Sequence, residues 1–320
     1  MPVLSLNDLA WRLSTPLPRL YAIAANAKHH YRQWERVTTK RGVTKSRTIR
    51  APSDELKAIQ KLIVKRVFAE YEVHPSAHGG VKKRSTRTNA QLHVGQKCVV
   101  NLDARRFYPS VSHHRVYSLL VRGLGIGRDA ASLITRLVTY DGQLIQGAPT
   151  SSVIANLLLR RPVDEPVSQD AKSAGLNYSR YLDDITLSGD NPRILINRVA
   201  QGLSRAGVSM HRRSNRFRLP SGKLQIVEKP KFVISSNAMR QEVTGLVVNG
   251  SSAPTVSRSK RDLVRAAINN LRGITDITER RRELDSIRGR IAHVRQFNPG
   301  GAQRLSKYLA RIVTDLHFLD

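Results

Sequence analysis

Cysteine is almost absent from this chain of 320 residues, and no long apolar run occurs in it. The single cysteine, Cys98, excludes an intrachain disulfide, and a lone thiol is typical of a reducing compartment, so we expect a cytoplasmic protein. Charged residues interrupt every apolar stretch before it reaches the roughly 18 residues of a spanning helix. The N-terminus also lacks the basic and apolar regions of a signal peptide, so we expect no membrane association.

Acidic residues are scarce relative to basic ones. Lys and Arg number 54 against 24 Asp and Glu, which gives a net charge of +30 at pH 7, spread along the chain. A polyanion is therefore the expected partner. No segment joins a clean apolar face to a basic one, so nucleic acid is favoured over an anionic membrane surface. A hydrophobic content of 40% is ordinary for a chain that buries a core.

The periodicity of apolar residues indicates an α+β body followed by a basic helical module. Helical spacing is found within residues 1–30, 54–70, 105–120 and 191–206, and after Pro149. Strand alternation predicts hairpins at 31–52 and 177–188, a buried strand at 97–103, and strands near 224–236 and 242–249. After Pro254, three helices are predicted near 257–272, 277–296 and 301–317.

Three acids stand in apolar surroundings, where a carboxylate has a desolvation cost. Asp103 ends the predicted buried strand, while Asp183 and Asp184 lie near the turn of the second hairpin. Like charges this close disfavour each other unless a cation lies between them. Carboxylates on neighbouring strands can hold two Mg²⁺ ions about 3.5–4 Å apart, which indicates nucleotidyl transfer. The simpler alternative is a polar hairpin turn and an N-cap for the following helix.

The segments around these acids resemble motifs of reverse transcriptases. Residues 101–110 resemble the first catalytic motif, residues 146–152 the template and nucleotide positioning motif, and residues 181–184, Tyr-Leu-Asp-Asp, the aspartate-pair hairpin. Asn89-Ala-Gln-Leu-His93 resembles the Asn-Ala-x-x-His element of bacterial retron reverse transcriptases. Val243, Thr244 and Gly245 resemble the element that precedes their RNA-binding tail. By these motifs the chain is identified as a member of the retron reverse transcriptases, from about residue 40 to 250.

This resemblance implies an α+β right-hand polymerase with fingers, a palm of antiparallel sheet and helices, and a C-terminal helical thumb. Residues 1–96 would form the N-terminal helices and fingers, and residues 97–250 the palm, with part of the fingers near 125–160. Residues 251–320 would form a helical thumb that binds RNA. For this last segment a plain helical bundle with a charged face is the alternative.

The resemblance also implies roles for individual residues. Asp103, Asp183 and Asp184 match the catalytic aspartates that bind two Mg²⁺ ions, and Tyr108 matches the bulky residue that blocks a ribose 2′-hydroxyl and so selects dNTPs. Other positions match nucleotide-binding residues: Lys45 and Arg47 at the triphosphate, Gln146 and Gly147 at the base pair, and Lys231 as a proton donor to pyrophosphate, with Lys229 close by. The family markers Asn89, His93, Val243, Thr244 and Gly245 have no assigned role.

The implied function is RNA-directed DNA polymerisation that copies part of a cognate structured noncoding RNA into multicopy single-stranded DNA (msDNA). Priming would start from a 2′-hydroxyl of that RNA, and the RNA–DNA product would serve antiphage defence with a separate effector protein. Two alternatives stay open. One is another bacterial reverse transcriptase, either defence-associated or related to group II introns, and the other is a noncatalytic basic RNA-binding protein.

Overall fold

A computed structural model describes residues 1–40, 43–211, 216–218, 224–226, 232–250 and 252–315 of the chain. For residues 38–40, 43–45, 47, 216–218 and 224–226 it describes the backbone alone. The chain divides into two compact units: unit 1 contains Met1–Ser85 and Val100–Ile234, and unit 2 contains Thr86–Val99 and Ser235–Asp320. Helices and antiparallel sheet occur together, so the predicted α+β class is confirmed. The division into fingers, palm and thumb at residues 96 and 250 stays a prediction.

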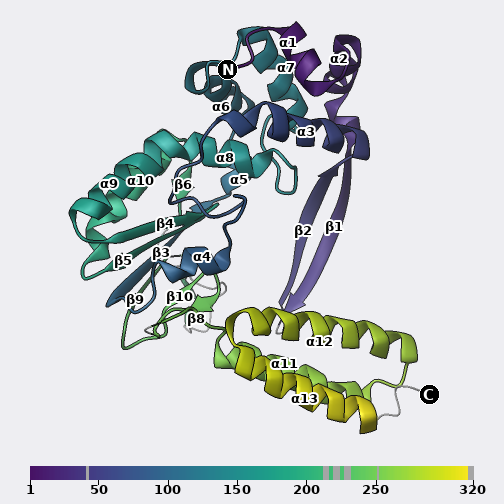
Figure 1. Cartoon of the computed structure of the whole chain (residues 1–320), viewed down its shortest axis with the longest axis vertical. Coiled ribbons are helices and arrows are strands. Elements are labelled where there is room, and N and C mark those ends of the chain that lie inside the picture. The colour runs from purple at the N-terminus through teal and green to yellow at the C-terminus, as the bar shows by residue number, and fades with distance from the viewer. Residues whose placement is uncertain (41–42, 212–215, 219–223, 227–231, 251, 316–320) are drawn as a thin grey trace. The chain divides into compact units, whose positions relative to one another are not determined.

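The main sheet has the strand order β4-β5-β3-β6, with β9 also paired to β3. Its strands are β3 (Cys98–Arg105), β4 (Asn177–Tyr181), β5 (Asp184–Gly189), β6 (Ser209–Met210) and β9 (Phe232–Ser236). Every residue of β5 after Asp184 is buried, as expected for a strand covered on both faces. Helices α9 (Glu165–Ser173) and α10 (Ile196–Arg205) lie alongside β4 and β6 of this sheet (Figure 1).

A second layer of unit 1 is helical. It consists of α1 (Leu6–Leu13), α2 (Leu17–Ala25), α3 (Asp54–Arg66), α5 (Phe107–Ser110), α6 (His113–Ser118), α7 (Arg128–Val138) and α8 (Ser151–Leu159). Ser53 begins α3 by accepting a hydrogen bond from the backbone N–H of Leu56, and Leu56 and Ile63 then enter the shared core. Helices α7 and α9 are absent from the sequence prediction, although the buried residues of α7 follow the helical period.

Two further strand pairs belong to unit 1. The predicted hairpin at 31–52 is confirmed as β1 (Tyr31–Lys40) and β2 (Val43–Pro52), which pair along their whole length from Tyr31↔Pro52 to Lys40↔Val43. The short strands β7 (Arg216–Arg218) and β8 (Leu224–Ile226) also pair antiparallel. The predicted region at 224–236 is therefore two strands, β8 and β9.

Unit 2 contains a bundle of α11 (Arg258–Asn270), α12 (Ile277–Phe297) and α13 (Pro299–Asp315), close to the three predicted helices. Ser257 and Asp276 cap the first two, each accepting a hydrogen bond from a backbone N–H in the first turn. Ile268, Ile287 and Ile312 are fully buried between the helices. Helix α4 (Thr86–Gln91) and the hairpin of β10 (Glu242–Val243) and β11 (Leu246–Val247) complete the unit. Across both units, no described helix is long and apolar enough to span a membrane.

The bundle offers a matched test of its core on one helix. Replacing the buried Ile287 of α12 by Ala should lower the free energy of opening of α11–α13 by about 2–5 kcal/mol, measured by hydrogen exchange of their amides. The same change at Ile277, which is 65% exposed on the same helix, should alter it by less than about 0.5 kcal/mol. Equal effects of the two substitutions would contradict the packing described here.

Candidate active site

The hairpin of β4 and β5 places two acids at its tip. Pairing runs from Asn177↔Ser188 to Tyr181↔Asp184, so Leu182 and Asp183 form the turn and Asp184 begins β5. We call Tyr181–Asp184 the aspartate turn. Leu182 has a φ of 58°, a conformation that residues with a Cβ atom rarely adopt.

Gly79, on a neighbouring segment, leaves room for Leu182 in this conformation. A Cβ atom at Gly79 would lie 2.6 Å from Cγ and 2.7 Å from the backbone nitrogen of Leu182. Any larger residue at position 79 would therefore displace the aspartate turn.

Asp103 lies beside the aspartate turn on the adjacent strand β3. The backbone N–H of Ala104 donates to the carbonyl of Asp183 at 3.1 Å, which brings two acids that are distant in sequence to one place in the sheet. The carboxylate of Asp103 is 16% exposed, and its Oδ1 lies 3.4 Å from Nε2 of His211. The backbone N–H of His211 in turn donates to the Asp103 carbonyl at 2.9 Å.

The donor set suits a hard divalent cation, because carboxylate oxygens are the preferred ligands of Mg²⁺. The carboxylates are not gathered around one point, however. Within the part of the chain that the structure describes, no group of three or more His, Cys, Asp or Glu side chains is arranged to hold a metal ion. Mutual repulsion favours separated carboxylates unless a cation lies between them. The residue types therefore fit Mg²⁺, and binding requires the side chains to turn toward a common point.

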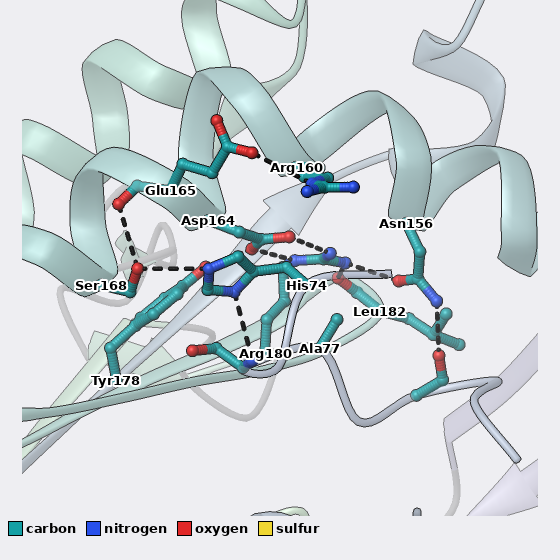
Figure 2. A network of polar contacts seen from close by, with 12 residues as sticks. His74, Ala77, Asn156, Arg160, Asp164, Glu165, Ser168, Tyr178, Arg180 and Leu182 are labelled. Carbon is teal, nitrogen blue, oxygen red and sulfur yellow. Dashed lines mark hydrogen bonds and ion pairs between the residues drawn. The ribbon is translucent and has the colours of Figure 1, made fainter. Parts of the chain in front are cut away.

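A buried ion pair between Arg180 and Asp164 lies next to the aspartate turn (Figure 2). Arg180, the residue before Tyr181, and Asp164 of the π-helical turn η4 (Arg160–Asp164) are both fully buried. Nε of Arg180 donates to Oδ1 of Asp164 at 2.8 Å and Nη2 donates to Oδ2 at 2.6 Å. The hydroxyl of Tyr178 donates to Oδ1 at 2.6 Å. These contacts form a bidentate, charge-assisted arrangement, the strongest class of side-chain hydrogen bond.

The pKa shifts follow from burial and from this pairing. Burial alone would lower the pKa of Arg180, but the charge and hydrogen bonds of Asp164 outweigh that effect and raise it above its ordinary value. Burial, followed by the charge of Asp164, raises the pKa of the Tyr178 hydroxyl well above its usual range. The arginine is therefore cationic and the tyrosine protonated at any physiological pH.

The remaining donor of Arg180 reaches the turn itself. Its Nη1 donates to the carbonyl of Leu182 at 3.1 Å and to Oδ1 of Asn156 at 3.0 Å, and Nδ2 of Asn156 donates to the carbonyl of Gly79 at 2.9 Å. One guanidinium group thus connects helix α8, η4 and the aspartate turn (Figure 2). We call Asn156, Asp164, Tyr178 and Arg180 the arginine network.

Sequence reasoning missed the arginine network, although a signal for it exists. Arg180 is a lone cation within a buried strand pattern, whereas Asp164 stands among Arg160, Arg161 and Glu165 and shows no such signal. The desolvation argument that singles out Asp103 therefore applies to Arg180 as well.

Tyr108 lies on α5, at the end of the strand that carries Asp103. Burial and, secondarily, the charge of Asp183 raise the pKa of its hydroxyl to about 12.

The predicted positioning loop is exposed at Gln146 and Gly147. Gly147 has a φ of 106°, and a Cβ atom there would lie 3.4 Å from the carbonyl oxygen of Arg50 on β2. Glycine therefore suits the backbone conformation, while the contact with Arg50 would leave room for a Cβ atom.

The predicted triphosphate ligands are described in part. Lys45 and Arg47 lie on β2 opposite Thr38 and Arg36, and their side chains are outside the described part of the structure. Lys231 and Lys229 lie outside the described residues altogether. Their roles stay predictions.

The family markers come together in unit 2. Asn89 of α4 and His93 just after it are fully buried, and α4 packs against β10 and β11. Thr244 and Gly245 form the turn of that hairpin with φ values of 46° and 80°, and Oγ1 of Thr244 donates to the carbonyl of Thr86 at 3.2 Å. Val243, also fully buried, belongs to the core of the same unit. Two elements far apart in the sequence therefore form one local structure.

Comparison with known proteins gives a consistent family. The model of the family "Reverse transcriptase (RNA-dependent DNA polymerase)" matches residues 38–235. The chain is 33% identical to the retron Mx65 reverse transcriptase of Myxococcus xanthus, over 82% of this chain and 60% of that protein. It is 36% identical to the retron Mx162 reverse transcriptase of the same organism, over 75% of this chain and 52% of that protein.

A relative of similar length is the retron Ec86 reverse transcriptase of Escherichia coli, with 28% identity over 98% of this chain and 91% of that protein. The chain thus spans little more than half of the two M. xanthus proteins and most of the E. coli protein. Among solved structures, the Sicinivirus 3Dpol RNA dependent RNA polymerase overlaps with a TM-score of 0.46 and 12% identity, over 93% of this chain and 72% of that one, which is too distant to carry an argument.

Breaking the buried ion pair of the arginine network should lower the free energy of unfolding more than breaking an ion pair at the surface. Replacing Asp164 by Asn leaves the Arg180 charge buried without an anion, and should lower the free energy of unfolding by about 3–5 kcal/mol, measured by urea denaturation. Asp170 of α9 pairs with Arg198 at 2.9 Å at the partly exposed surface, and its replacement by Asn should cost no more than about 1 kcal/mol. Comparable losses in the two variants would contradict this assignment.

Proposed function

Because the chain belongs to the reverse transcriptase (RNA-dependent DNA polymerase) family, and within it to the retron reverse transcriptases, we propose that it copies RNA into DNA at the aspartate turn. The observation that carries this proposal is the hydrogen bond from the N–H of Ala104, the residue after Asp103, to the Asp183 carbonyl, which brings the strand of one expected catalytic acid against another. The net charge of +30 supports nucleic acid as the substrate.

In this proposal Asp103, Asp183 and Asp184 hold two Mg²⁺ ions by carboxylate oxygens. To do so, Asp103 turns its carboxylate away from His211, which lies 3.4 Å from it. When bound, Mg²⁺ would activate the attacking hydroxyl and neutralise the leaving pyrophosphate. The arginine network holds the backbone of the aspartate turn still while the side chains move, since Arg180 donates to the Leu182 carbonyl.

The other nucleotide-binding residues take the roles that the resemblance implies. Tyr108 lies close enough to Asp183 for the charge of Asp183 to affect its pKa, which supports a place near the sugar of an incoming dNTP. Gln146 and Gly147 are exposed, which supports a place for them at the base pair. Lys45, Arg47 and Lys231 complete the proposed set as cations for the triphosphate.

The partner in this proposal is a cognate structured noncoding RNA, part of which becomes msDNA, with priming from one of its 2′-hydroxyl groups. The basic helices of unit 2 would bind that RNA, as the resemblance implies for the tail. We further propose a cytoplasmic role in antiphage defence, in which the RNA–DNA product acts with a separate effector protein.

Replacing Asp183 or Asp184 by Asn should reduce primer extension on an RNA template with Mg²⁺ and dNTPs by about 10²–10⁴-fold, because the acids would supply charge stabilisation worth several kcal/mol. The matched control is Asp190→Asn, an exposed acid directly after β5 and outside the turn, which should retain activity. Unchanged extension by the Asp183 and Asp184 variants would show that this pair does not catalyse the reaction and would favour a noncatalytic RNA-binding protein.

Tyr108 should select deoxynucleotides through its ring. Tyr108→Ala opens the space beside the sugar, so discrimination against ribonucleotides should fall by about tenfold or more, a steric effect of 1–3 kcal/mol. Tyr108→Phe keeps the ring and should keep the discrimination. The measurement is the ratio of kcat/KM for dGTP and GTP in single-nucleotide extension, and an unchanged ratio in the alanine variant would remove Tyr108 from the sugar site.

A further inference from the structure

Unit 1 contains a cavity of about 890 Å³ that none of the proposed polymerase residues lines. Five arginines line it, and we call it the arginine cavity: Arg115, Arg122, Arg160, Arg161 and Arg205. Leucines and a proline form its apolar wall: Leu119, Leu124, Leu157, Leu158 and Pro162. A volume of this size accommodates a ligand of roughly one or two nucleotides.

The cavity carries a local excess of positive charge. Within the described residues, only Arg160 of the five arginines has an ionic partner, Glu165 at 3.0 Å. Three glutamates line the cavity, and Glu70 is also already neutralised, by Arg12 at 2.8 Å and by the N-terminal amine at 2.6 Å. Among the described residues, four arginines without an ionic partner therefore line the cavity together with one glutamate that has no ionic partner, Glu72.

Arg115 and Arg160 are the two cavity arginines that are half-buried, whereas the other three are exposed. The guanidinium of Arg115 lies against Gly207, a glycine whose φ of 71° follows from its place directly after the C-cap of α10. The Arg115 side chain is half-buried, and it makes no hydrogen bond or ion pair with any residue that the structure describes. A partly desolvated guanidinium without an acceptor is unfavourable, and an anion in the cavity would supply one.

The backbone around the cavity is also unusual. Both π-helical turns found in the described residues line it: η3 (Leu119–Gly123), which carries Arg122, and η4, which carries Arg160 and Arg161. Short π-helical turns within helices occur frequently at functional sites. The same η4 ends in Asp164, so the turn that forms the arginine network on one side presents two arginines to the cavity on the other.

From these observations we propose that the arginine cavity binds one or two nucleotides of a single-stranded segment of RNA, outside the polymerase site. The guanidinium groups bind the phosphates, for which their planar donor fork is suited, and a base lies against the apolar wall. A duplex would keep its bases stacked inside and could not use that wall, so an unpaired segment fits better. The choice of RNA over other polyanions rests on the proposed function.

The test compares two triple variants of the full chain. Arg122→Ala/Arg161→Ala/Arg205→Ala removes three exposed cavity arginines, and the control Arg128→Ala/Arg136→Ala/Arg193→Ala removes three exposed arginines of unit 1 that do not line the cavity. None of the six has an ionic partner among the described residues. Both triples remove the same charge, so a general electrostatic effect is equal in the two.

The probe is a fluorescein-labelled 12-nucleotide oligo(U) RNA with one central 4-thiouridine. Its affinity is measured by anisotropy between 50 and 300 mM salt, and its crosslinked peptides are identified by mass spectrometry. We expect the cavity triple to bind about tenfold more weakly than the control and to lose about 0.7 in the slope of log K against log salt for each phosphate contact removed. Crosslinks to residues 119–124 or 157–162 should appear in the wild type and the control and disappear in the cavity triple.

Equal affinity and slope in the two triples, or wild-type crosslinks confined to residues outside the cavity, would overturn the proposal. Primer extension on poly(rA)/oligo(dT) at saturating template tests the polymerase function separately from RNA binding in the cavity. Both triples should keep wild-type extension, since neither alters the aspartate turn. A wild type that crosslinks through the cavity but extends no primer would refute the polymerase function and leave the cavity site standing.

Discussion

The ion pair between Arg180 and Asp164 is the interaction on which the candidate site depends. Removing two charges from water carries a large desolvation cost, which is offset only where the geometry is close and every donor and acceptor is used. Here Asp164 accepts three hydrogen bonds, from Nε and Nη2 of Arg180 and from Tyr178, while Nη1 of Arg180 donates to Asn156 and Leu182. An apolar pair of the same volume would fill the space as well, but it would offer no donor to the carbonyl of Leu182. We therefore attribute to this pair a role in fixing one conformation of the turn.

That role explains how a strained turn persists at the tip of a hairpin. Leu182 has a positive φ, and Gly79 packs directly against it, so the turn fits only one arrangement of its neighbours. The arginine network links both segments, because Asn156 bonds Arg180 and the Gly79 carbonyl at once. A turn held in this way keeps the backbone of Asp183 and Asp184 in one place, although their like charges repel each other.

The sequence predicted most of the regular structure and the position of the acids, for local reasons. Apolar periodicity located both hairpins and the three helices of unit 2, and desolvation cost singled out Asp103, Asp183 and Asp184. The same reasoning was available for Arg180, but its pairing with Asp164 depends on contact between η4 and β4, which no local pattern specifies. Gly79 illustrates the same limit, since its requirement comes from Leu182, a residue distant in sequence. The packing of Asn89 and His93 near Thr244 likewise appears only once α4 and the β10–β11 hairpin are placed together.

Net charge explains attraction to nucleic acid but not where a strand is bound. A surface with a charge of +30 binds phosphates wherever arginines and lysines are exposed, with little preference for one path. Position is determined where cations combine with shape, because a base can be desolvated only against an apolar wall and a phosphate only among converging donors. In unit 1 the segment from α8 through η4 contributes to both the aspartate turn and the arginine cavity. Asn156 and Asp164 support the turn. Leu157, Arg160 and Arg161 line the cavity. A substitution that shifts η4 would therefore act on the turn and the cavity together, whereas removal of an exposed arginine acts on the cavity alone.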